Sequence, residues 1–70
     1  MSIMNHIKEI RAKHQWTQSD LANAVNVSRQ TIVALEKGSY IPSLLLAMKI
    51  SDAFSLPIEE IFKLQKEELE

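Results

Sequence analysis

The chain contains no cysteine, and this absence removes several kinds of chemistry at once. Without thiols there is no disulfide framework, no thiolate metal site and no cysteine nucleophile, as expected of a cytoplasmic protein. The longest apolar run, Leu44 to Met48, is far too short to cross a membrane. The N-terminal residues do not combine a basic region with an apolar core, so we expect no secretion signal.

Glycine and histidine are also scarce, and their placement argues against an enzyme. The single glycine, Gly38, leaves no glycine-rich phosphate loop. His6 and His14 are eight residues apart without a supporting cysteine or aspartate, so we expect no metal site. Glu59 and Glu60 are adjacent and point in different directions on a helix, which does not suit paired acid and base catalysis. We therefore expect neither a catalytic residue nor a cofactor.

What remains is the composition of one small globular domain. The 70 residues are 46% apolar and 24% charged, enough for a single modest core over residues 1–70. The net charge is −1, but residues 1–40 carry +2 and residues 41–70 carry −3. A basic half and an acidic half fit one surface that faces DNA and another that faces away. Ordinary scatter of charges is the alternative explanation.

Residues 17–38 have the pattern of two short helices, each with its own start signal. Thr17 is an N-cap, and Asp20 three residues later completes an imperfect capping box. Ser28 is the N-cap of the second helix. Each cap is flanked by apolar residues spaced as a hydrophobic staple, Trp16 with Leu21 and Val27 with Ile32.

The connection between these helices is a tight turn. Asn26 tolerates the left-handed conformation that such a turn needs, and the small Ala22 lets the helices approach behind it. Gly38 stands where the second helix should end in a left-handed cap. One buried seam joins the two helices: Leu21, Val25, Val27, Ile32 and Leu35. This arrangement predicts a helix-turn-helix.

The stretch TQSDLANAVNVSRQTIVALEKG, residues 17–38, resembles the helix-turn-helix of the XRE family, the class of phage Cro and lambda-type repressors. With the continuation YIPSLLLAMKISDAFSLPIEEIF, the similarity covers about residues 5–62. It implies an all-α fold, a compact five-helix, lambda-repressor-like DNA-binding domain. The family usually has glycine where this chain has Asn26 and Ser55, so both positions are expected to need a positive φ angle.

An amphipathic stripe predicts a first helix over about 5–13, ahead of the motif helices at about 18–25 and 29–37. Ser43 is expected to cap a fourth helix that turns six apolar residues inward: Leu44, Leu46, Ala47, Ile50, Ala53 and Phe54. A fifth helix follows Pro57 over about 58–64. The tail, about 63–70, either extends this helix or frays.

In this architecture the recognition helix, about 28–37, enters the major groove of DNA with its start near the base edges. Arg29 and Gln30 follow the cap and are expected to project outward. Arginine pairs bidentately with guanine and glutamine with adenine. The resemblance implies base readout from five positions: Ser28, Arg29, Gln30, Thr31 and Ala34. A solvated helix face is the alternative interpretation of Arg29 and Gln30.

Other residues are expected to hold the backbone of the DNA or the frame of the domain. Gln18 opens the first motif helix, where free N–H groups favour a phosphate, and the family uses the matching glutamine for this contact. Arg11 and Glu36 match a pair that the family uses as an internal salt bridge, which gives Arg11 a structural role. Three residues after or at the end of the recognition helix are further phosphate candidates: Lys37, Ser39 and Tyr40.

We therefore predict a sequence-specific DNA-binding transcriptional regulator that represses by occupying a promoter. Because a domain this small reads few base pairs, we expect a homodimer on an inverted-repeat operator. Four apolar residues are candidates for its interface: Leu45, Met48, Leu64 and Leu69. The alternative is a protein-interaction module of the same fold, such as an antitoxin-like or adaptor component. The acidic C-terminal half suits this alternative, whereas Gln18, Arg29 and Gln30 argue for DNA.

Overall fold

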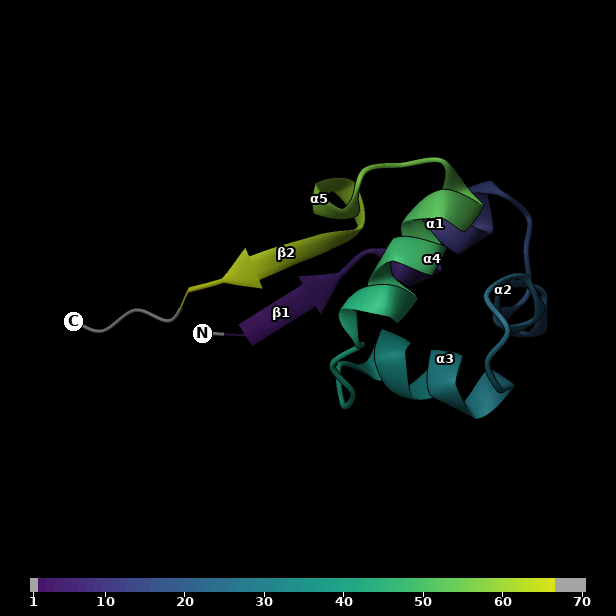
Figure 1. Ribbon diagram of the computed structural model, residues 1–70, viewed down its shortest axis with the longest axis horizontal. Helices are drawn as coiled ribbons and strands as arrows, with labels where there is room; N and C mark the ends of the chain where they lie inside the picture. Colours follow the sequence, from purple (N-terminus) through teal and green to yellow (C-terminus); the bar gives the residue numbers. More distant parts are fainter. Residues whose placement is uncertain (1, 67–70) are drawn as a thin grey trace.

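The computed structural model describes residues 2–66, and within them it contains five helices and two short strands (Figure 1). The elements are β1 (Ser2–Asn5), α1 (Ile7–Lys13), α2 (Gln18–Ala24), α3 (Arg29–Lys37), α4 (Leu44–Phe54), α5 (Ile58–Ile61) and β2 (Phe62–Gln65). The five helices agree with the prediction. The all-α class is not correct, because the two ends of the domain pair as strands.

The two strands form an antiparallel ribbon that extends from the helical body (Figure 1). Ile3 lies opposite Leu64, and Asn5 lies opposite Phe62. The pairing continues into the body, where the His6 amide donates to the Ile61 carbonyl at 2.9 Å. This ribbon satisfies backbone groups at both ends of the domain, which a lone tail would leave to water.

The ribbon explains why two predicted helices are shorter than expected. The first begins at Ile7 rather than residue 5, since β1 takes up residues 2–5. The fifth ends at Ile61 rather than residue 64, because Phe62 to Gln65 alternate apolar and polar side chains, the period of a strand. The predicted tail, 63–70, is therefore neither helical nor frayed over its first residues, and residues 67–70 lie outside the described part.

Three of the helices start with an N-cap side chain that hydrogen-bonds to the first turn. The Thr17 hydroxyl accepts from the Asp20 amide at 3.0 Å, and the Asp20 carboxylate accepts from the Thr17 amide at 2.8 Å. This reciprocal pair is the predicted capping box. Ser28 and Ser43 cap α3 and α4 through a single hydrogen bond each. The serine hydroxyl accepts from the amide three residues later. The caps fix where the two motif helices start, and hence which residues stand at their tips.

Apolar side chains from all five helices meet in one core, with eleven buried residues: Ile7, Ile10, Leu21, Ala22, Val25, Ile32, Leu35, Leu46, Ile50, Phe54 and Ile61. Trp16 covers the edge of this core. Its ring centroid is 5.4 Å from that of His14 and 5.5 Å from that of Phe54. Across the motif turn, the Val27 amide donates to the Ala22 carbonyl at 2.9 Å, which holds α2 and α3 together.

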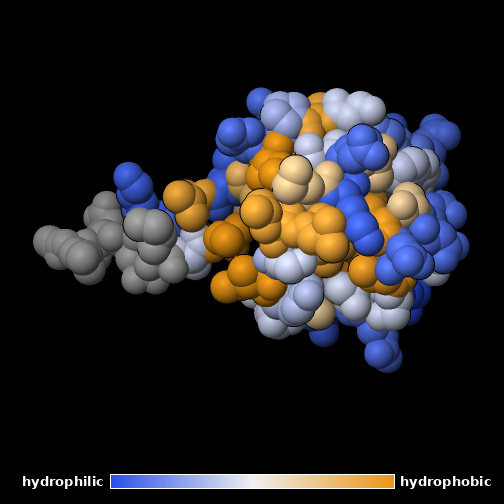
Figure 2. Space-filling view, viewed as in Figure 1, coloured by the Kyte–Doolittle hydropathy of each residue, from blue (hydrophilic) through white to orange (hydrophobic). Residues whose placement is uncertain are grey.

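Leu44 departs from the prediction that it packs inward. It is 73% exposed, whereas Leu46 and Ile50 form the buried face of α4. Leu44 lies one turn before Met48, on the outer face of the same helix. Figure 2 shows hydrophobic side chains gathered over the base of the ribbon and the start of α4.

Two non-glycine residues hold the turns that were expected to be left-handed. Asn26 has a φ of 61° and Ser55 a φ of 56°, beside the glycine cap Gly38 at 81°. Gln15 also has a positive φ, 59°, in the connection before α2, which the sequence did not indicate. Residues other than glycine adopt this left-handed backbone conformation at a cost of ~1 kcal/mol.

Replacing Ser55 by glycine should therefore stabilise the domain, by up to about 1 kcal/mol, offset partly by the greater freedom of the unfolded chain. Asn26→Gly should gain less, since asparagine tolerates the left-handed region better. Thermal unfolding of both variants beside the wild type measures the difference. A Ser55→Gly variant that melts below the wild type would show that the serine side chain stabilises this turn.

Candidate nucleic-acid interface

The helix α3 lies on the outside of the body, along the side away from α5 (Figure 1). Two of its residues, Ile32 and Leu35, are 0% and 1% exposed and fix it to the core. The opposite face carries Arg29, Gln30 and Lys37, all exposed. An outward helix that is anchored only through its inner face is free to enter a groove.

The five predicted readout residues lie at the start and middle of this helix. The Ser28 hydroxyl accepts from the Thr31 amide at 3.2 Å and lies 3.1 Å from the Thr31 hydroxyl, so both side chains take part in the helix cap. Gln30 makes no side-chain hydrogen bond within residues 2–66. Ala34 is half-buried. Val33, half-buried, shares the outer face with Arg29 and Gln30 at helical spacing, and the predicted readout set omitted it.

Arg11 and Glu36 form a bidentate ion pair between α1 and α3. Arg11 Nε donates to Glu36 Oε2 at 2.8 Å, and Arg11 Nη2 donates to Glu36 Oε1 at 3.3 Å. A third donor, Arg11 Nη1, reaches the Trp16 carbonyl at 2.8 Å. The side chains are 14% and 7% exposed, so water screens this pair little. The geometry gives Arg11 a structural position rather than one on the surface.

Gln18 extends this ion pair to the tip of α3. Its Nε2 donates to Glu36 Oε1 at 3.1 Å, and its Oε1 accepts from Arg29 Nη2 at 3.0 Å. Gln18 and Arg29 each directly follow an N-cap, so the two helix starts meet at this contact. Gln18 was predicted to contact phosphate and Arg29 to project outward, and the contact between them was not predicted. The chain Arg11–Glu36–Gln18–Arg29 thus joins α1, α2 and α3 in one polar network.

The network sets the charge of Glu36. Burial acts to raise the pKa of this carboxyl, but hydrogen bonds from Arg11 and Gln18, with the positive charges of Arg11 and Lys8, outweigh burial. Its pKa therefore lies below the ordinary value. The hydrogen bond to Glu36 raises the pKa of Arg11 above its ordinary value, although the burial of Arg11 acts to lower it. Both groups are charged at neutral pH.

The loop after α3 holds the remaining phosphate candidates. Lys37 and Ser39 are exposed, and Tyr40 is 42% exposed. The Ser39 hydroxyl donates to the Ala34 carbonyl at 3.2 Å, so its one hydrogen is used in the end cap of α3. Lys37 and Tyr40 make no side-chain hydrogen bond within residues 2–66, whereas the Ser39 hydroxyl is used at the end of the helix.

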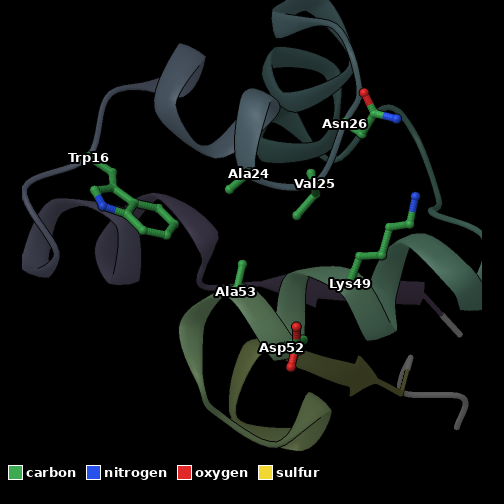
Figure 3. Close-up of a pocket in the computed structure, with 7 residues that line it drawn as sticks. All are labelled: Trp16, Ala24, Val25, Asn26, Lys49, Asp52 and Ala53. Atoms are coloured by element: carbon green, nitrogen blue, oxygen red, sulfur yellow. The ribbon is translucent and has the colours of Figure 1, made fainter.

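The body also has open hollows. One, about 340 Å³, lies between the end of α2 and α4, with Trp16 at one end and Asn26 and Lys49 at the other (Figure 3). A larger one, about 530 Å³, lies between α1 and the region of Leu56 and Glu60. Within residues 2–66, no three histidine or acidic side chains gather to hold a metal ion. No helix among these residues is long and apolar enough to cross a membrane. The candidate site is the outer face of α3 with the start of α2, where exposed Arg29 and Gln30 lie and Gln18 contacts Arg29.

Replacing Glu36 by glutamine should destabilise the domain by roughly 2–3 kcal/mol, because Arg11 loses its charged partner in a little-exposed site. The lowered pKa of Glu36 makes its contribution largest above the unfolded-state value, ~4.3, and the contribution is lost as pH falls through the folded-state pKa. Urea unfolding across this pH range should show a shallower pH dependence in Glu36→Gln. The exposed Glu59→Gln is the matched control, and an equal loss in both variants would contradict the role of the network.

Comparisons with known proteins agree with this geometry. A helix-turn-helix family model matches residues 7–61. The uncharacterised HTH-type transcriptional regulator YgzD of Bacillus subtilis is 51% identical over 63 residues, which are 90% of this chain and 96% of YgzD. The cryptic phage CTXphi transcriptional repressor RstR of Vibrio cholerae is 31% identical over 55 residues, 79% of this chain and 50% of RstR.

The fold also has a close counterpart among solved structures. The restriction-modification controller protein C.AhdI from Aeromonas hydrophila superposes with a TM-score of 0.73 over 77% of this chain and 82% of its own. At 24% sequence identity, this likeness concerns the fold alone. Together with the family match over most of the chain, these findings show that the protein belongs to the helix-turn-helix family, in its XRE class.

Proposed function

We propose that this protein is a sequence-specific DNA-binding transcriptional regulator that inserts α3 into the major groove. The observation that carries the proposal is the link between the two helix starts, in which Gln18 holds Arg29 at 3.0 Å. A long, exposed arginine is normally free to move, and a hydrogen bond to an anchored neighbour reduces the entropy lost on binding. An ordinary solvated helix face has no need of such a restraint.

Base readout is assigned to the exposed start of α3. Arg29 uses one N–H of Nη2 for Gln18, and the rest of its guanidinium fork remains to pair with the O6 and N7 atoms of guanine. Gln30, beside it, has the amide that suits adenine. Ser28, Thr31 and Ala34 then lie closer to the sugar-phosphate edge or to thymine methyl groups. Val33, on the same face, offers a second apolar contact of that kind.

Phosphate contacts are assigned to both ends of this face. The Gln18 amide has two hydrogens, of which one goes to Glu36, so the other is available to a phosphate oxygen. Lys37 and Tyr40 supply donors at the far end. Ser39 contributes only if its hydroxyl leaves the Ala34 carbonyl. These contacts set the register of the domain on DNA and do not read sequence.

Arg11 adds little to the charge of the DNA face, because Glu36 neutralises it internally. The cations left near the motif are few, chiefly Arg29 and Lys37. Electrostatic binding should therefore be modest for each copy, and specificity should rest on the anchored start of α3.

We further propose that the protein acts as a homodimer on an inverted repeat and represses by occupying a promoter. One copy reads only a few base pairs, and two copies double the site. The similarity to RstR, a repressor by name, supports repression. Of the interface candidates, Leu45, Met48 and Leu64 are exposed, and Leu69 lies outside the described residues. A protein-interaction module is the second candidate, which the exposed apolar residues also favour.

Selection of bound sequences from random DNA, followed by a gel shift on the selected site, tests the proposal. Affinity should fall with salt, with a log–log slope of about −0.9 for each phosphate neutralised, and the few available cations imply only a handful per copy. Scrambled DNA of the same composition is the control. If the affinity is the same on selected and scrambled DNA and does not change with salt, the protein-interaction module is the better explanation.

Replacing Arg29 by alanine should cost roughly 1–3 kcal/mol of specific binding and relax the preference at one base position, because one bidentate pair is worth about that much. Gln18→Ala should weaken binding to all sequences and also release Arg29, so the double variant should lose less than the two single losses added together. Titrations on selected and random DNA measure these terms. Strict additivity would mean that the Gln18–Arg29 contact has no part in recognition.

A further inference from the structure

The large apolar side chains that are exposed among the described residues come from a few elements only. The helices α1, α2 and α3 expose no large hydrophobic side chain. All eight that are exposed belong to the ribbon, to the loop after α3 or to the first half of α4: Ile3, Met4, Tyr40, Ile41, Leu44, Leu45, Met48 and Leu64. A grouping of this kind on a small domain is typical of an interaction site.

One face of the ribbon carries an apolar cross-strand pair and continues onto the helical body. Ile3 and Leu64 lie opposite each other on the face that also carries Asn5 and Phe62. That face points inward at its base, because Asn5 Nδ2 donates to the Leu35 carbonyl at 2.9 Å and Phe62 packs against the core. Further out, Ile3 and Leu64 are 37% and 65% exposed, so among residues 2–66 this part of the face is partly open to solvent.

The start of α4 supplies other exposed apolar side chains. Leu44 and Met48 lie one turn apart on its outer face, and Ile41 in the preceding loop is 69% exposed. Figure 2 shows this region beside the base of the ribbon, with hydrophobic side chains over both. We call the five residues the apolar flank: Ile3, Ile41, Leu44, Met48 and Leu64.

Most of the apolar flank lies in chain segments without charge. Residues 2–5 and 38–48 contain no charged side chain and no histidine, and Leu64 is flanked on one side by Lys63, which lies on the other face of the ribbon. In a two-fold contact, a residue near the axis meets its own copy, so a charge there would repel itself. Four of the five flank residues stand in charge-free segments, so their immediate neighbours in the chain add no such repulsion.

We propose that the apolar flank is the surface through which two copies of this chain associate, with the ribbon of each against α4 of the other. This proposal rests on the proposed function, because an inverted-repeat operator requires two copies of the domain. A different protein partner would more often be matched by complementary charges, which this flank does not offer. Arg29 lies at the start of α3 and Ile41 beyond its end, ~13 Å of helix away, so the dimer leaves the readout residues uncovered.

The decisive experiment is sedimentation velocity of the full chain without DNA, over a range of concentrations. The wild type should form a dimer. Met48→Glu, on α4, and Leu64→Glu, on the ribbon, should each raise the dimer dissociation constant at least about tenfold, because each buries an unpaired carboxylate. Ala12→Glu, which adds the same charge on the exposed face of α1, should behave as the wild type. Circular dichroism verifies that each variant is folded.

Met48→Gln and Leu64→Gln, which remove the apolar group without adding charge, replace any glutamate variant that fails to fold. A monomeric wild type overturns the inference, and so does a dimer that either substitution leaves intact. If the folded monomer still binds a selected half-site, the proposed function stands and only this interface is wrong. A dimer sensitive to both substitutions that binds no DNA supports the interface and contradicts the proposed function.

Discussion

The ion pair between Arg11 and Glu36 is the interaction on which the candidate site depends. Glu36 is on the helix that we assign to the groove, yet its carboxylate points inward, where Arg11 and Gln18 satisfy both oxygens. Because the pair is little exposed, its geometry is fixed by short, charge-assisted hydrogen bonds. Gln18 transmits that order to Arg29. One little-exposed carboxylate therefore links three helices and, through Gln18, the side chain proposed to read DNA.

The ribbon provides a second constraint, at the other end of α3. Asn5 in β1 donates to the carbonyl of Leu35, so the N-terminal strand holds the last turn of the outer helix. The start of α3 is thus held by the Gln18 side chain and its end by the Asn5 side chain. With Ile32 and Leu35 buried between these contacts, α3 has little freedom to tilt. This rigidity suits a helix that must present its face without rearrangement.

Local signals made the helical part of the fold predictable from sequence. Thr17, Ser28 and Ser43 cap their helices, and Asn26 and Ser55 take the left-handed turns that the resemblance implied. The ribbon was missed because its strands are four residues long and pair across almost the whole chain, with no turn signal between them. Leu44 was placed inward because apolar residues occupy nearly every position at the start of α4, so periodicity there is weak. The Gln18–Arg29 contact depends on how two helix starts meet in space, which no spacing within one helix reveals.

The pairing of Ser2–Asn5 with Phe62–Gln65 also affects how the domain is made. A ribosome delivers β1 first and β2 last, so the earliest strand has no partner until almost every other residue of the domain has been synthesised. Until then its apolar side chains and unpaired backbone groups are open to other chains. The helical motif consists mostly of local contacts and needs no such delay. The ribbon can therefore close only after the helices between its two strands have been synthesised.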